Sequence, residues 1–333
     1  MKRFVVLVFL AFFLFSCNEK KEENKSISQT DKPLFLELKY AKGFEVLYFE
    51  NHKEIKIKHP ESDEILQSLI ISDTSRIKPN FRSVFSGSTT HLAFIDALGG
   101  NKKVRGFINK DYIYNPTYLN QFDTGETIDI GYGEDVDLEK LISNKPDVFF
   151  ISGLLGKAPQ FEKIEQMGIP LIEVVEWAEI HPLARAEWIR YYGELFDVKQ
   201  KADSLFNEIE QNYLNLLSKA DVLDSVDKPL VLTGSSYKGT WYLPGGKNFS
   251  SILMTHAGGN YPFHKTSYTS ESLPYYMESV EKEFINADVW LRPGAKSLEA
   301  LESEDERYSE FKAFKIGNVY EANNRTLPNG AND

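Results

Sequence analysis

The sequence predicts an α/β protein in which two Rossmann-like lobes are joined by a long rigid linker helix. Three observations predict this fold. Short apolar strands alternate with helical segments between residues 83 and 175, which favours parallel strands with helices on both faces. Residues 182–220 are helical with no strand between them, and the alternation then resumes at residue 230. Apart from the amino-terminal region, about 300 residues remain, more than one core usually serves, so two lobes are expected.

The first lobe is predicted to cover residues 33–178. Its amino-terminal part reads as strands at residues 44–49 and 54–58, which flank a polar turn. Glycines at 99, 100 and 168 end two of the helices that follow. Further strands are expected at residues 83–86, 104–108, 148–151 and 171–175, and helices at 90–98, 137–143 and 159–167.

The linker is predicted over residues 179–222 and the second lobe over residues 223–333. Two helices, at 182–196 and 199–220, make up the linker, and the second of them is about 32 Å long at 1.5 Å per residue. Strands at 230–233 and 289–291 mark the second lobe. Apolar side chains at helical spacing form one stripe on the second linker helix: Ala202, Leu205, Phe206, Ile209, Tyr213, Leu216 and Leu217.

The amino terminus has the pattern of a secretory signal over residues 1–16. Lys2 and Arg3 precede an apolar run at 4–15, which is too short to span a bilayer. Residues 14–17 (LFSC) resemble a bacterial lipobox, so we expect cleavage before Cys17 and a lipid on its thiol. The alternative is a cleaved soluble protein with an incidental cysteine. Because Cys17 is the only cysteine, no intramolecular disulfide can form.

Residues 17–32 read as a flexible, lipid-anchored tether, because they are rich in Glu, Lys and Ser and nearly free of apolar side chains. The formal net charge of the chain is −11, and removal of residues 1–16 takes away two positive charges and no negative one, which leaves −13. This charge argues against nucleic acid or anionic lipid as a partner. We expect an exported protein anchored in the bacterial cell envelope, on the periplasmic face of a membrane or at the cell surface.

Several segments, in order, resemble the helical-backbone class of periplasmic binding proteins, which serve ABC importers of ferric siderophores, haem and vitamin B12. They are residues 86–99 (SGSTTHLAFIDALG), 137–147 (DLEKLISNKPD), 168–170 (GIP), 185–188 (RAEW) and 287–290 (ADVW). The resemblance implies a monomer that holds its ligand between the lobes and delivers it to a permease driven by ATPase subunits. It implies no catalysis and no covalent cofactor beyond the lipid on Cys17.

The ligand residues are expected at the carboxyl ends of strands, where open α/β folds bind ligands. The first group follows the strand at 83–86; an alternative is that these hydroxyls only cap a helix. A second group, in the loop 235–242, offers aromatic rings that suit a flat organic ligand, although such rings also pack against cores. The candidates are Ser88, Thr89, Thr90, His91, Trp177, Tyr237, Lys238, Trp241, Tyr242 and Arg292.

Two glutamates are the candidate docking residues. In the resembled family an exposed glutamate on each lobe meets arginines of the permease, and Glu139 and Glu278 match these places, with Glu281 close to the second. The alternative is that both simply complement the positive end of a helix dipole.

A ferric siderophore is the leading ligand, followed by cobalamin and haem. Lys238 and Arg292 suit an anionic complex. Two other classes stay open: capture of a bare metal ion by His91, His256 and His264, and a surface lipoprotein that binds another protein. The motifs HExxH, GxxxxGK[ST] and GxSxG are absent, which argues against the corresponding enzymes.

Residues 318–333 read as a strand followed by a loop. Members of the resembled family usually continue with a further loop and a helix that closes the second lobe. The two alternatives are a chain that ends early and a lobe that lacks this helix.

Overall fold

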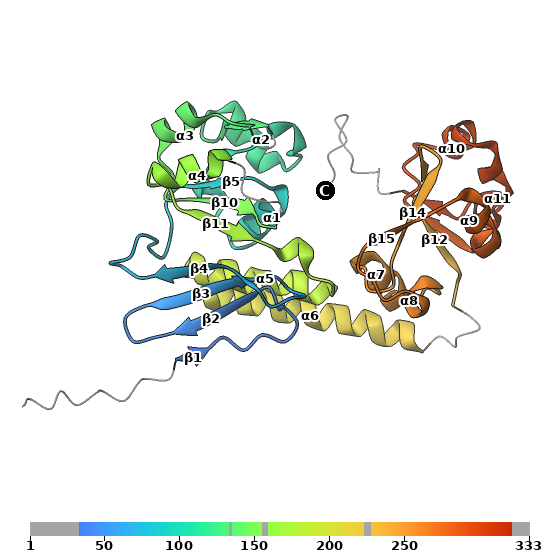
Figure 1. The fold of residues 1–333 in the computed structure, drawn as a ribbon, viewed down its shortest axis with the longest axis horizontal. Helices are drawn as coiled ribbons and strands as arrows, with labels where there is room; N and C mark the ends of the chain where they lie inside the picture. The colour runs from blue at the N-terminus through green and yellow to red at the C-terminus, as the bar shows by residue number, and fades with distance from the viewer. Residues whose placement is uncertain (1–32, 133–134, 155–158, 223–227, 322–333) are drawn as a thin grey trace, which may run out of the picture.

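The computed structural model describes residues 33–132, 135–154, 159–222 and 228–321. Figure 1 shows two lobes and a pair of helices, α5 and α6, that run beneath the first lobe and toward the second. The predicted fold class is therefore confirmed, with parallel sheets and a long helix pair. The predicted signal, Cys17 and tether lie outside the described residues, and the exact lobe boundaries stay predictions.

The first lobe is built on a parallel sheet in the order β11-β10-β5-β6-β7. Strand β10 (Val148–Ser152), which lies between β11 and β5, is buried on both faces, as a parallel strand between helix layers must be, and pairs with β11 in the register Phe149↔Leu171. The other elements are β5 (Val84–Ser86), β6 (Val104–Phe107), β7 (Ile128–Asp129), β11 (Leu171–Val174), α1 (Thr89–Ala97), α2 (Pro116–Asp123), α3 (Leu138–Asn144), α4 (Pro159–Gln166), η1 (Asn101–Lys103), η2 (Lys110–Tyr112), η3 (Glu176–Ala178) and the hairpin β8 (Gly131–Tyr132) with β9 (Asp135–Val136).

A separate antiparallel sheet, β1-β2-β3-β4, precedes this lobe. Strands β2 (Phe44–Tyr48) and β3 (Lys53–Lys58) match the predicted pair, whereas β1 (Leu34–Phe35) is short and β4 (Ile65–Ile71) was not identified from the sequence. Strand β4 is hard to recognise because Ile65 and Ile70 are exposed and only Leu69 and Ile71 are buried. The sheet shares one core with the linker helices.

Helix α5 (Pro182–Leu195) is almost wholly buried, so it is part of the first lobe's core. Helix α6 (Lys199–Asp221) has 23 residues and reaches the second lobe (Figure 1). The predicted apolar stripe on α6 is buried only at its start: Ala202 and Phe206 are buried, whereas Ile209 and Leu216 are exposed. The first lobe's core therefore covers this stripe only over the first two turns of α6.

Buried carboxylates of α5 and the segment before it fix the amino-terminal sheet. Glu187 accepts hydrogen bonds from the backbone N–H groups of Lys39, Tyr40 and Ala41, at 2.8–2.9 Å to its nearer oxygens. Glu179 accepts from the N–H groups of residues 42 and 43 at 2.8 and 2.7 Å. Such charge-assisted bonds are stronger than neutral ones. They hold the chain between β1 and β2 against the linker.

The second lobe combines a parallel sheet, β12-β16-β17, with an antiparallel one, β13-β14-β15. Aromatic side chains fill its core: the rings of Trp241 and Trp290 contact each other, and each also contacts the rings of Tyr308 and Phe311. Its elements are β12 (Val231–Thr233), β13 (Ser236–Tyr237), β14 (Thr240–Pro244), β15 (Ser272–Tyr275), β16 (Val289–Leu291), β17 (Val319–Tyr320), α7 (Phe249–His256), α8 (Phe263–Thr266), α9 (Met277–Phe284), α10 (Leu298–Glu304), η4 (Glu306–Glu310) and α11 (Lys312–Lys315).

Candidate functional site

The first lobe brings two of the predicted ligand segments to the carboxyl edge of its sheet. Ser88 to Thr90 follow β5, and Trp177 lies on η3, which follows β11. A hydrogen bond joins the two segments, because the Thr90 hydroxyl donates to Oε1 of the buried Glu176 at 2.5 Å. The sequence prediction did not include Glu176.

Ser88 is the N-cap of α1, and its hydroxyl oxygen accepts from the Thr90 N–H at 3.3 Å. The Ser88 and Thr90 hydroxyls also lie 2.9 Å apart. Ser88 therefore caps the helix, which was the alternative interpretation of these hydroxyl groups. Because Thr90 is exposed and Ser88 and Thr89 are half-buried, all three remain available as ligand contacts.

His91 was predicted to contact the ligand, and this prediction is wrong, because its side chain is fully buried. The ring lies within hydrogen-bond distance of the Ser86 hydroxyl, with 3.3 Å between Nδ1 and Oγ. Burial lowers the pKa of His91, although the nearby Glu176 opposes this shift. Helical spacing could have indicated burial, since His91 lies one turn before the buried Ile95.

Trp177 keeps 39% of its surface exposed, so it is available to a ligand as predicted. Arg185 of α5 donates from Nη2 to the Trp177 carbonyl at 2.6 Å. The guanidinium of Arg185 also lies 4.0 Å from the ring centroid of Phe249 on α7, which is a cation–π contact with the second lobe. The backbone of Trp177 is therefore connected to the junction between the lobes.

In the second lobe, the segment predicted as a loop is the hairpin β13–β14, in which Tyr237 pairs with Thr240. Lys238 and Gly239 form its two-residue turn with φ of 51° and 82°. The prediction for Trp241 is wrong: this ring is fully buried, and its Nε1 donates to the Thr233 carbonyl at 2.9 Å.

Tyr237 and Tyr242 are exposed, at 65% and 53%, because successive side chains of a strand point to opposite faces and Trp241 occupies the inner one. Lys238 Nζ lies 5.1 Å from the Tyr237 ring centroid, which places a positive charge beside the exposed ring.

Arg292 is exposed and directly follows β16, so it lies at the carboxyl end of the second parallel sheet. Its φ is 55°, a left-handed conformation that is uncommon for a residue other than glycine. The Arg292 N–H donates to the Tyr320 carbonyl at 2.7 Å, which extends the pairing of β16 with β17.

The two candidate docking residues occupy matching positions. Glu139 and Glu278 are both exposed and stand in the first turn of α3 and α9 respectively. Oε1 of Glu278 lies 3.9 Å from Arg307, a weak surface pair. First-turn acids complement the helix dipole in any protein, so their position alone does not distinguish the two interpretations.

Several aromatic rings meet at the junction of the lobes, and the sequence analysis did not predict these contacts. Tyr40 stacks on His181 with 5.4 Å between ring centroids, and His181 lies 5.5 Å from His256. The Tyr213 hydroxyl is 2.8 Å from Nδ1 of His256. Burial first, and then the neighbouring histidine, lowers the pKa of His181. A cavity of about 660 Å³ adjoins this cluster, between residues 40–61 and 247–271.

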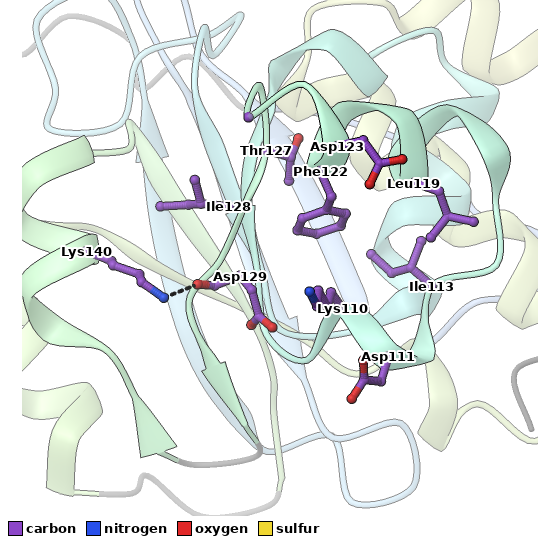
Figure 2. A pocket seen from close by; sticks show the side chains of 11 residues that line it. Lys110, Asp111, Ile113, Leu119, Phe122, Asp123, Thr127, Ile128, Asp129 and Lys140 are labelled. Atoms are coloured by element: carbon purple, nitrogen blue, oxygen red, sulfur yellow. Dashed lines mark hydrogen bonds between the residues drawn. The ribbon is translucent and has the colours of Figure 1, made fainter. Parts of the chain in front are cut away.

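A second cavity, of about 690 Å³, lies at the free edge of the first sheet beside β7 (Figure 2). Phe122, Leu119 and Ile128 give it apolar walls, and Lys140 donates to the Asp129 carbonyl at its rim. None of the predicted ligand residues lines either cavity.

A smaller pocket, of about 70 Å³, brings Thr89 together with Tyr112 and Tyr114. These two tyrosines were missed, although they follow the predicted strand at 104–108 and so lie at the same carboxyl edge as Thr89.

Convergence of His91, His256 and His264 on a metal ion is not found: His91 lies in the first lobe, whereas the other two lie on α7 and α8 of the second. Across the described ranges, no three or more His, Cys, Asp or Glu side chains are grouped so as to hold a metal ion. In the same part of the chain, no helix combines the length and apolar character needed to cross a membrane.

Comparison with known proteins identifies the family. The family model described as "Periplasmic binding protein" matches residues 84–326. An uncharacterized lipoprotein of Methanocaldococcus jannaschii is 22% identical over 95% of this chain and 85% of its own length. The periplasmic haem-binding protein HutB of Vibrio cholerae has a TM-score of 0.57 at 16% identity, covering 78% of this chain and 94% of that chain. The siderophore-binding protein BauB has a TM-score of 0.56 at 16% identity, covering 80% and 88%.

The chain belongs to the periplasmic binding protein family, because the family match spans well over half of its length. The predicted resemblance and the absence of an enzymatic function are thereby confirmed. Members of this family work outside the cytoplasm as substrate-binding components of ABC transporters. The antiparallel sheet of residues 34–71 precedes the matched region.

Proposed function

We propose that this chain is a lipid-anchored binding protein that captures a ferric siderophore between its lobes and delivers it to the permease of an ABC importer. The observation that carries this proposal is the placement of exposed hydroxyl, aromatic and cationic groups at or beside the strand ends of both lobes. They are Thr90 and Trp177 in the first lobe and Tyr237 and Arg292 in the second, where Tyr242 in the middle of β14 adds a further exposed ring.

The chemistry of these groups fits an anionic metal complex with flat ligand rings. Exposed aromatic rings give large contact area with few rotatable bonds, and Arg292 and Lys238 offer charge-assisted hydrogen bonds to carboxylate or catecholate oxygens. A structural relative binds ferric iron with two acinetobactin molecules, which supports a siderophore. Haem is the second candidate, since another relative is a haem-binding protein, and the same rings suit a porphyrin.

Delivery requires a surface that a permease can recognise. Glu139 and Glu278 are exposed in equivalent positions on the two lobes, and we assign them to arginines of the two permease subunits. Exposed pairs of this kind contribute orientation and association rate more than affinity. Lipidation at Cys17 is supported by the lipoprotein names of two relatives, and it would keep the protein beside the permease.

Tryptophan fluorescence tests this proposal directly, because three of the four tryptophans (Trp188, Trp241 and Trp290) are fully buried and Trp177 alone is exposed. The mature protein is titrated with ferric siderophores, haemin and cyanocobalamin. We expect submicromolar, saturable quenching by a ferric siderophore, which Trp177→Phe greatly reduces while the protein stays folded. Saturable quenching by haemin or cyanocobalamin instead would show that haem or cobalamin is the ligand. No response to any of the three would refute capture of a metal complex.

A further inference from the structure

Three buried polar atoms of the first lobe have no hydrogen-bond partner among the residues that the structure describes. They are His91 Nε2, Glu176 Oε2 and Tyr192 Oη. Within the described ranges only one other buried side-chain atom shares this property, Gln160 Nε2 on α4. His91 and Tyr192 are fully buried, and Glu176 is 4% exposed. Buried polar atoms are nearly always bonded to protein or to ordered water, so three such atoms in one lobe need an explanation.

The three side chains come from three different elements, two of which also carry Thr90 and Trp177. His91 lies on α1, Glu176 on η3 and Tyr192 on α5. The rings of His91 and Tyr192 both pack on Phe150, at 6.3 and 5.4 Å between centroids. The carboxylate of Glu176 interacts electrostatically with His91 and with Tyr192. Burial raises the pKa of Tyr192, and the negative charge of Glu176 raises it further. Burial lowers the pKa of His91, and the same charge opposes that shift.

The hydrogen atoms of this cluster can be assigned from its other bonds. The Ser86 hydroxyl donates its one hydrogen to the Ser88 carbonyl at 3.1 Å, so in its contact with His91 it must accept from Nδ1–H. In the neutral ring, Nε2 then carries a lone pair. Oε1 of Glu176 already accepts from Thr90, and Oε2 can only accept.

The three unpartnered atoms therefore comprise two acceptors, His91 Nε2 and Glu176 Oε2, and one hydroxyl, that of Tyr192. One hydroxyl hydrogen cannot satisfy two acceptors. A water molecule supplies what is missing, because it donates two hydrogens and accepts one. Protonation of the histidine would also provide a donor, but burial disfavours the charged ring.

We propose that His91, Glu176 and Tyr192 enclose a buried water molecule that donates to the histidine and the carboxylate and accepts from the tyrosine. This water joins α1, η3 and α5. It makes Glu176 a positioning residue, since the carboxylate that accepts from the water also holds the Thr90 hydroxyl and precedes Trp177 in the chain. The site does not depend on which ligand the cleft binds.

A high-resolution crystal structure of the full mature chain is the first test. We expect a density peak at about 2.6–3.2 Å from all three atoms. A direct Tyr192–Glu176 hydrogen bond with no such peak would overturn the proposal. Nitrogen-15 NMR of the His91 ring gives an independent result: a neutral ring protonated at Nδ1 agrees with the water, whereas a doubly protonated ring refutes it.

A pair of variants extends the test to solution. Tyr192→Phe removes the hydroxyl that bonds the water, and Tyr191→Phe is the matched control, because the Tyr191 hydroxyl bonds a backbone carbonyl instead, that of Glu173 at 3.3 Å. We expect both proteins to fold, a lower melting temperature for Tyr192→Phe than for wild type, and a changed NMR signal of His91 only in Tyr192→Phe. If Tyr192→Phe melts at or above the wild-type temperature with an unchanged His91 signal, its hydroxyl had no partner and the proposal is wrong.

Discussion

Replacing Glu187 with alanine should destabilise the first lobe severely. Its carboxylate is fully buried and accepts from three consecutive backbone N–H groups, those of Lys39, Tyr40 and Ala41, and from Arg190 at 3.0 Å. The alanine variant leaves the three N–H groups without this acceptor, whereas Arg190 keeps its hydrogen bonds to the Glu37 carbonyl and to Asp203. Hydrogen bonds to a charged group contribute about 1.5–3 kcal/mol each, but water can reach the exposed Lys39, so the contributions do not add fully.

Removal of one partner from a buried ionic cluster typically costs about 3–5 kcal/mol, which we take as the expected loss in the free energy of unfolding. With an unfolding entropy of about 2.1 cal/mol/K per residue, such a loss lowers the melting temperature of a protein of this size by about 4–7 °C. Glu187→Gln keeps one acceptor oxygen but turns an amide donor toward the same N–H groups, so its melting temperature should fall between those of wild type and Glu187→Ala.

Thermal denaturation followed by circular dichroism measures this effect, with Glu208→Ala as the control. Glu208 is an exposed residue of α6, where the same substitution should change stability by less than about 0.5 kcal/mol. Hydrogen exchange should in addition show faster exchange of the Tyr40 and Ala41 amides in Glu187→Ala. If Glu187→Ala melts with the control and these amides stay protected, the carboxylate does not hold the amino-terminal sheet.

Three further outcomes follow from the structure. Combined Glu139→Arg and Glu278→Arg should abolish import by cells while ligand affinity in vitro stays unchanged; continued import would rule out the docking assignment. Trp241→Ala should cost about 3–5 kcal/mol in chemical denaturation, because it empties a core position; a small effect would place the ring outside the core. The side-chain hydrogen bond from Lys312 lowers the pKa of Asp288, so its stabilisation is present above the unfolded pKa and is lost as pH falls toward and below the folded pKa. Asp288→Asn should therefore flatten the decline of stability below about pH 4, and an unchanged acid profile would contradict this.

The parallel sheets could be predicted because their strands carry unambiguous patterns. Residues 148–151 are continuously apolar and lie between two helical segments, which is typical of a strand buried on both faces, and β10 is such a strand. The helices α1, α3 and α4 begin or end at residues with clear local signals, such as the N-cap Asp137. Local chemistry determines these elements, so the sequence alone was sufficient.

The hairpin at residues 236–244 could have been predicted and was not. Lys238 and Gly239 form a two-residue turn with both φ angles positive, which matches the right-handed twist of hairpin strands. Once the turn is recognised, alternation places Trp241 and Leu243 on one face and Tyr242 on the other. Treating the segment as a loop removed this distinction and made Trp241 a ligand residue.

The buried carboxylates could not have been predicted in the same way. Glu187 meets its partners across 146–148 residues of chain, and its helix position resembles that of any solvated glutamate. Only the packing of the amino-terminal sheet on α5 shows that the side chain is enclosed. The same holds for Glu176, whose partners Thr90 and His91 lie on another element.

The attachment of the amino-terminal sheet to the linker has a mechanical consequence. The described fold begins at residue 33, next to β1, and the following loop is fastened to α5 by Glu187 and Glu179. A force applied to the chain at residue 33 is therefore transmitted through these two carboxylates to the linker helices. The same helix, α5, holds the backbone of Trp177, because Arg185 donates to the Trp177 carbonyl at 2.6 Å, so the force also reaches one of the predicted ligand segments of the first lobe.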